Sequence, residues 1–151
     1  MDAEIYAVVV RRLVEADHGW GQPYDFQAIY VLDQAVPNVE EDPSGGIKDP
    51  EQGQPLDEAL RSALQALLAD LPTLTFVQSF YDVYDAARPG PNQIRDGGAY
   101  IALGPVYEDA KTAVVGAMFY GGRLWSRSIR YYLEQEEEVW RIASSKILAV
   151  S

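Results

Sequence analysis

Residues 112–134 read TAVVGAMFYGGRLWSRSIRYYLE, and their pattern decides the fold. From Trp125 onward every other side chain is apolar, apart from Arg127. This alternation is typical of a strand with one buried face. Residues 112–120 carry apolar side chains on both faces, as expected for a central strand that is covered on each side. The glycines between the two runs therefore predict a turn that joins antiparallel neighbours.

Two further runs extend this pair on either side along the chain. Residues 99–106 and 139–150 are rich in strand-forming side chains, and short links of glycine, aspartate and glutamate separate the runs. This spacing predicts a four-stranded antiparallel meander at the C-terminal end. Residues 134–138 include four glutamates, which are expected at a solvated hairpin tip that discourages aggregation of the sheet edge.

Two amphipathic helices are predicted in the first half of the chain. Residues 3–17 repeat apolar side chains at helical spacing, and the helix should end near Asp17-His18-Gly19, because glycine readily closes a helix. The second helix should begin at Pro55 and end at Leu71, before Pro72. Its apolar stripe consists of Leu56, Leu60, Leu64, Leu67, Leu68 and Leu71.

The order of these elements indicates the α+β class. Residues 26–36 and 73–84 add two strand-forming segments, so we predict two helices packed on a curved, mainly antiparallel sheet. A chain of 151 residues suits a single domain over 1–151. Residues 37–54 mix proline, glycine and acidic side chains without an apolar period, which predicts a mobile acidic loop.

Charge narrows the classes of partner. The formal net charge is −11, which repels nucleic acid and anionic lipid and leaves basic proteins as the expected partners. Residues 38–58 hold seven carboxylates and one lysine. The predicted protein-binding residues in this segment are Glu40, Glu41, Asp42, Asp49 and Glu51.

Residue types that are rare or missing exclude several chemistries. The chain has no cysteine and one histidine, His18, so disulfides, thiol nucleophiles and metal sites built from several imidazoles are excluded within one chain. We expect no metal and no cofactor. No secretory signal pattern and no long uncharged apolar run is visible, so we expect a cytoplasmic protein that does not associate with membranes.

The last third resembles a known family. Thr112-Ala113-Val114-Val115, then Tyr132 and Glu134, then Val139-Trp140-Arg141-Ile142 resemble the final strands of nuclear transport factor 2-like (cystatin-like) cone-shaped domains. The resemblance implies an apolar pocket between helix and sheet, on a scaffold that serves both catalysis and plain binding.

Arg127 is the main candidate for a ligand-binding residue. It shares the apolar side of its strand, and a buried guanidinium needs a carboxylate or a ligand. One interpretation is an arginine that grips an anion in a pocket with aromatic walls, formed by Trp125, Tyr131 and Tyr120. The other is an internal ion pair or a position at the rim of the sheet, and the sequence favours this structural role.

His18 is the one candidate for a catalytic base. Asp17 beside it could orient the imidazole for proton transfer. A histidine just before a helix-ending glycine more often places favourable charge at the helix terminus, and this second interpretation is preferred.

Two functional hypotheses follow from these residues. The first is a non-enzymatic acidic binding module that engages a basic protein partner, as an inhibitor or an immunity-type protein does. The alternative is a small-molecule pocket protein or a cofactor-free enzyme of the cone-shaped type, with Arg127 and its neighbours in the cavity. A homodimer through an exposed sheet face is a third arrangement compatible with the sequence.

Overall fold

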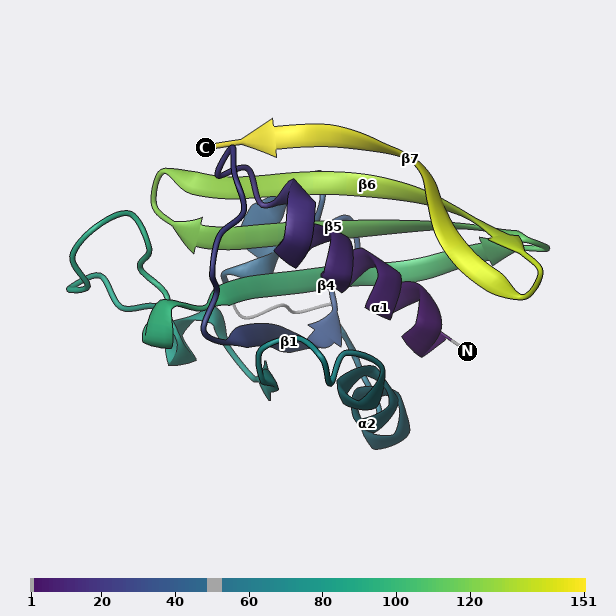
Figure 1. The fold of residues 1–151 in the computed structure, drawn as a ribbon, viewed down its shortest axis with the longest axis horizontal. Helices are drawn as coiled ribbons and strands as arrows, with labels where there is room; N and C mark the ends of the chain where they lie inside the picture. Colours follow the sequence, from purple (N-terminus) through teal and green to yellow (C-terminus); the bar gives the residue numbers. More distant parts are fainter. Residues whose placement is uncertain (1, 49–52) are drawn as a thin grey trace.

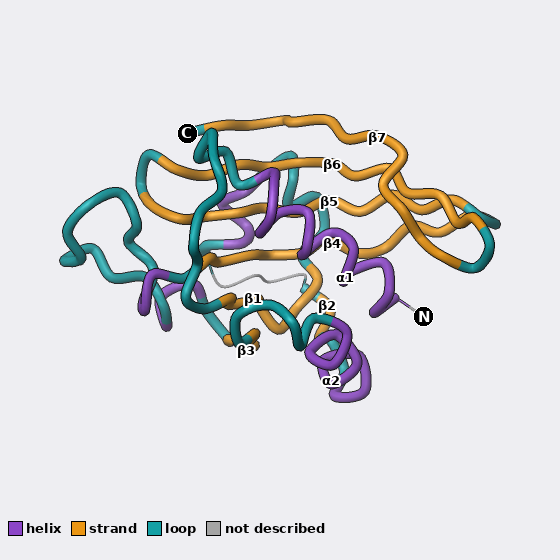
Figure 2. The backbone as a smooth tube through the Cα atoms, in the orientation of Figure 1, coloured by secondary structure: helices purple, strands orange, loops and turns teal. Residues whose placement is uncertain are grey.

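One curved sheet runs through the protein. The computed structural model describes residues 2–48 and 53–151. The elements are α1 Asp2–Arg12, β1 Ile29–Ala35, β2 Gln54–Pro55, α2 Glu58–Leu67, β3 Leu74–Val77, β4 Ala99–Asp109, β5 Thr112–Gly122, β6 Trp125–Glu136 and β7 Val139–Val150. Within the described ranges, seven strands form one sheet in the order β2-β1-β4-β5-β6-β7, with β3 also paired to β1. Figures 1 and 2 show α1 lying across one face of the long strands.

The predicted α+β class and the C-terminal meander are confirmed. Strands β4 to β7 are consecutive antiparallel neighbours. Strand β1 runs parallel to β3 and β4, so the sheet is mainly rather than wholly antiparallel. The register places Thr112 opposite Glu134 and Tyr120 opposite Ser126, as expected for the hairpin formed by residues 112–134.

The main core lies between α1 and the sheet. The apolar stripe of α1, including Ile5 and Val9, packs on alternate residues of the central strands, including Val115, Phe119 and Ile129. These side chains fill the space between the helix and the middle of the sheet. The space in which the family resemblance implies a pocket is therefore filled by the core, and two open clefts lie outside it, one along α1 and one at its C-terminal end.

The opposite face of the sheet is covered by loop segments. Val39 and Phe80 belong to a second apolar cluster that also includes Tyr100 and Met118. The Tyr100 hydroxyl donates a hydrogen bond to the carbonyl oxygen of Gly46. Within the acidic loop predicted over 37–54, Val39 is thus buried on the outer face of the sheet, which α1 does not cover, while the mobility of the loop stays a prediction.

Helix α2 is shorter than the sequence predicted. It begins at Glu58, where the Asp57 carboxylate caps it by accepting a hydrogen bond from Leu60 N at 2.8 Å. Pro55 lies in β2 instead of the first helical turn, and the helix ends at Leu67 instead of Leu71. Of the leucine stripe, Leu64 and Leu68 are fully buried, whereas the side chain of Leu67 is 45% exposed.

Residues 73–84 form only a short strand. Strand β3 ends at Val77, and Ser79 and Asp82 form a reciprocal cap that starts a 3₁₀ turn at Phe80–Asp82. Local capping bonds therefore override the strand-forming composition of this segment. Neither described helix has the length and apolarity that a membrane crossing requires.

Candidate ligand-binding cleft

The end of the first helix builds one wall of the site. After α1, the chain continues in a wider π-helical turn, Leu13–Asp17, and Gly19 follows with φ of +85°. This left-handed conformation strongly favours glycine. An added Cβ at Gly19 would also overlap the side chain of Arg127, so this glycine lets the guanidinium lie against the backbone.

His18 is held inside an aromatic cluster. Its side chain is only 2% exposed, and its ring lies 5.4 Å from Phe26 and 6.2 Å from Trp125 between centroids. Burial, helped by the nearby positive charge of Arg127, lowers the pKa of His18, so the neutral ring is favoured. The preferred interpretation of His18 as a positive charge at the helix end is therefore wrong.

The hydrogen bonds of His18 define which nitrogen carries the proton. The Trp20 backbone N–H donates to His18 Nδ1 at 3.1 Å, so the proton of the neutral ring is on Nε2. Nδ1 is therefore not free to act as a base, because it already accepts this hydrogen bond. Since Nε2 is a donor, the neutral ring can contribute an N–H group to a ligand in the adjoining cleft.

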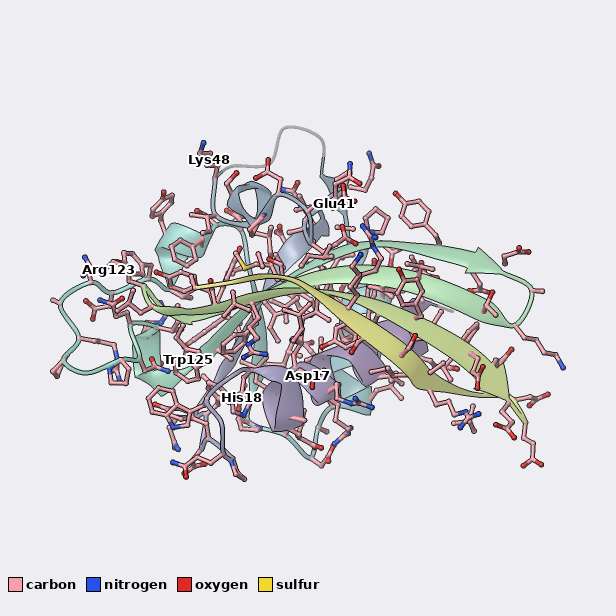
Figure 3. All side chains as sticks on the ribbon, turned by 90° about the horizontal axis from the view of Figure 1, so that it is seen from above. Asp17, His18, Glu41, Lys48, Arg123 and Trp125 are labelled. Atoms are coloured by element: carbon pink, nitrogen blue, oxygen red, sulfur yellow. The ribbon has the colours of Figure 1, made fainter. Side chains whose placement is uncertain are left out.

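Strand β6 fixes the helix end from the other side. Trp125 Nε1 donates to the His18 carbonyl at 2.7 Å, and the Tyr131 hydroxyl donates to the Asp17 carboxylate at 2.9 Å. Both side chains are buried, and burial raises the pKa of Tyr131 well above its usual value. Figure 3 shows Asp17, His18 and Trp125 on one side of the sheet. Trp125 and Tyr131 thus support the site by holding the helix end in position.

An open cleft of about 420 Å³ lies between the helix end and β6. It is lined by residues 15–19, by residues 21–23 and by Arg127. Among the described residues, no carboxylate oxygen lies within 4.0 Å of the Arg127 guanidinium. The internal ion pair expected for Arg127 is therefore not formed within that part of the chain.

Tyr120 does not belong to this cleft. It lies on the opposite face of the sheet, where its ring packs 4.8 Å from Phe80 and 6.1 Å from Tyr84. The prediction that Tyr120 forms an aromatic wall beside Arg127 is wrong, because residues 119 and 120 point to opposite faces of β5 and it is Phe119 that faces α1.

Of the predicted acidic protein-binding residues, Glu40 is buried, whereas Glu41 and Asp42 are exposed. Glu40 is 8% exposed and lies 3.5 Å from Arg130 Nε, while the Glu41 carboxylate accepts a hydrogen bond from Arg130 at 2.6 Å. Asp42 accepts a hydrogen bond from Ser44 Oγ at 2.5 Å. Asp49 and Glu51 lie outside the described residues. The prediction that Glu40 lies at a binding surface is therefore wrong, because Glu40 is buried against Gly116 beneath Arg130.

For some residues of the cleft, nothing in the sequence indicated a role in ligand binding. Gly19 was identified as a helix end, but its contact with Arg127 joins residues more than one hundred positions apart. Glu15 and Gln22 also line the cleft, although their positions suggested only an exposed helix face and an irregular link. In residues 2–48 and 53–151, no three carboxylate or imidazole groups gather in a way that could hold a metal ion.

Comparison with known proteins does not assign this cleft to a family. No protein family, no curated protein and no solved structure matches the chain.

Proposed function

We propose that the protein binds a small organic anion in the cleft between the helix end and β6. The observation that carries this proposal is that Arg127, a cation, lines the cleft and has no carboxylate partner among the described residues. A partly buried guanidinium gains most from a ligand that accepts its hydrogen bonds.

The surroundings of Arg127 support a ligand that accepts hydrogen bonds. His18 also lines this cleft, and its neutral ring carries an N–H donor at Nε2. A carboxylate group suits both donors, because it accepts hydrogen bonds through two oxygens. Asp17 and Glu15 contribute negative charge, so a ligand that also carries an amino group is compatible with the cleft.

Binding fits the cleft better than catalysis does. A general base must be free to accept a proton, whereas His18 Nδ1 already accepts a hydrogen bond and the Asp17 carboxylate accepts one from Tyr131. The lining holds no serine or threonine that could serve as a nucleophile. We therefore propose a non-enzymatic role; the cytoplasmic location, the family resemblance and the homodimer remain predictions.

The first hypothesis from the sequence, an acidic module for a basic protein, loses support at its original surface. Arg130 already engages Glu40 and Glu41, so these two carboxylates share one cation within the chain. The alternative hypothesis, a small-molecule pocket protein, retains Arg127 and His18 in the lining of one cleft, while the buried Trp125 and Tyr131 hold the helix end behind it. For this reason the small-molecule function is preferred.

Tryptophan fluorescence can test the proposed site. Trp125 donates a hydrogen bond to the carbonyl of His18, which lines the cleft, so occupation should alter the emission of Trp125. Acetate, succinate, benzoate, glycine and inorganic phosphate would be titrated against the wild type, Arg127→Gln and Arg127→Lys. We expect saturable binding of at least one carboxylate, about tenfold or more weaker in Arg127→Gln, because a hydrogen bond to a charged group contributes about 1.5–3 kcal/mol.

Arg123→Gln is the matched control. Arg123 is an exposed arginine at the β5–β6 turn that borders a different cleft, which Trp20 and Trp125 also line. Its removal should leave the affinity unchanged, whereas a probe that binds in that second cleft would be weakened. A wild type that saturates with none of the five probes would contradict the proposal, and so would equal affinity of the wild type and Arg127→Gln.

A further inference from the structure

A second concavity runs along the outer side of α1. It is a groove of about 560 Å³ between α1, the end of α2 and the first residues of β7. Its apolar lining includes Ala7, Val8, Leu67, Val139, Trp140 and Ile142. Leu67 and Val139 are 45% and 65% exposed, so large apolar surface is left in contact with water.

The topology explains why this groove is open. Figure 1 shows the β6–β7 hairpin extending past the N-terminal end of α1, and residues of both α1 and β7 line the groove. Trp140 is buried, whereas the lining residues Leu67 and Val139 remain exposed in the described structure. The groove follows α1 and its continuation from Glu4 to Ala16, which corresponds to about 18 Å at the helical rise of ~1.5 Å per residue.

Some of the charged side chains around the groove form ion pairs within the chain, and others do not. Arg11 is bonded to Asp70 and Glu15, and Arg141 to Glu134 and Glu136. Among the described residues, Glu4, Glu138 and Arg12 have no ion-pair partner within 4.0 Å. The groove therefore offers an acidic end near the β6–β7 hairpin and one free cation nearer the end of α1.

We propose that this groove binds an amphipathic helix of a protein partner, with apolar side chains on Val8, Trp140 and Leu67 and a basic residue at Glu4 and Glu138. An open apolar groove of this length suits about three turns of helix, which would present one apolar stripe. The chain's net charge of −11 favours a cationic partner by long-range attraction.

Charge and openness argue against an acyl chain as the occupant. The groove leaves one side open to water, so a hydrocarbon tail would remain partly hydrated. A fatty-acid carboxylate could pair with Arg12, but it would approach a protein of net negative charge. A basic helix gains binding free energy from the apolar lining and from the unpaired carboxylates. The tail of a fatty acid gains it from the apolar lining alone.

The inference is independent of the small-anion cleft. Glu15 and Ala16 border both concavities, but Arg127 lines only the cleft at the helix end. Arg127→Gln should therefore bind a helical partner as the wild type does, and this variant separates failure of one proposal from failure of the other.

A synthetic peptide provides the probe. A fluorescent 14-residue peptide with leucines at helical i, i+4, i+7 and i+11 positions and lysine and alanine elsewhere would be titrated by anisotropy at low salt. We expect Leu67→Ser and Val139→Ser each to weaken binding about fivefold to tenfold, since each removes apolar area from the contact. Glu4→Gln combined with Glu138→Gln should weaken binding several-fold and reduce its salt dependence.

Two controls and one competitor decide the outcome. Leu124 is 82% exposed at the β5–β6 turn, outside the groove, and Leu124→Ser should leave peptide binding unchanged. The same peptide with glutamate in place of lysine should bind at least tenfold more weakly. The proposal is overturned by no wild-type binding up to 1 mM peptide, by equal binding of the glutamate peptide, by an equal loss in Leu124→Ser, or by tighter binding of dodecanoate in the same groove.

Discussion

Two arginines on strand β6, Arg127 and Arg130, lie three residues apart and have opposite surroundings. Arg130 projects from the outer face, where it pairs with Glu40 and Glu41. Arg127 projects toward α1, where it lies against Gly19 and borders a cleft without an ion-pair partner in the described chain. Successive side chains of a strand point to opposite faces, so an odd separation places the two guanidinium groups on different sides of one sheet.

The difference teaches how to distinguish a structural cation from a binding one. Arg130 compensates a buried carboxylate, so its charge is already used by the fold. Arg127 is held in position by the backbone of the helix end but has no carboxylate to neutralise it. The same residue type thus stabilises the fold on one face and remains available to a ligand on the other.

The largest expected contrast is in stability. Arg130→Gln should lower the free energy of unfolding by about 2 kcal/mol, because it leaves the Glu40 carboxylate buried without its cation. Arg127→Gln should change it by less than about 0.5 kcal/mol, because no internal ion pair is lost. Urea unfolding of both variants measures this contrast. Equal destabilisation by the two substitutions would remove the distinction.

A substitution of a glycine on β5 tests the contact between Arg130 and Glu40 in a second way. Gly116 is the cross-strand partner of Arg130, and an added Cβ there would overlap the Glu40 carboxylate. Gly116→Ala should therefore cost about 1–2 kcal/mol through overpacking. In a Glu40→Ala background the same substitution should cost much less, because the overlap is absent. Equal costs in both backgrounds, measured by chemical unfolding, would show that Glu40 does not occupy this position.

The smallest effect concerns the neighbour of Arg127. His18 has a pKa lowered by burial and by Arg127, so the unfolded chain binds its proton at a higher pH than the folded chain does. Stability should then be highest above the ordinary pKa of about 6.5 and decrease as the pH falls below it.

His18→Gln provides the control for this pH dependence. His18 is the only histidine, and the variant should lose the part of the slope between pH 5.5 and 7. Thermal unfolding across this range compares the two proteins. An identical pH profile for both would mean that burial does not disfavour the charged imidazole.

Much of the fold could be predicted because its signals are local. The alternation after Trp125, the two-sided apolar pattern of residues 112–120 and the glycine at position 19 each specify nearby backbone structure. The sequence was less informative where distant contacts or capping bonds decide: α2 begins after its Asp57 cap, and Val39 of the predicted loop is buried on the sheet.

The site could be predicted only in part for the same reason. Strand alternation placed Arg127 with Trp125 and Tyr131, and the structure brings all three to the helix end. It could not show that Tyr120 faces the other apolar cluster, because residues 112–120 are apolar on both faces. Composition also could not show that Arg130 neutralises Glu40 and Glu41, since these residues are about ninety positions apart.

Nuclear magnetic resonance of the arginine side chains tests the central claim most directly. The Nε–H signals of Arg127 and Arg130 would be followed while the small carboxylate probes are added to the wild-type protein. Our account predicts that a binding carboxylate shifts the Arg127 signal and leaves that of Arg130 in place. A saturable shift of Arg130, or binding of the anion with the Arg127 signal unmoved, would contradict it.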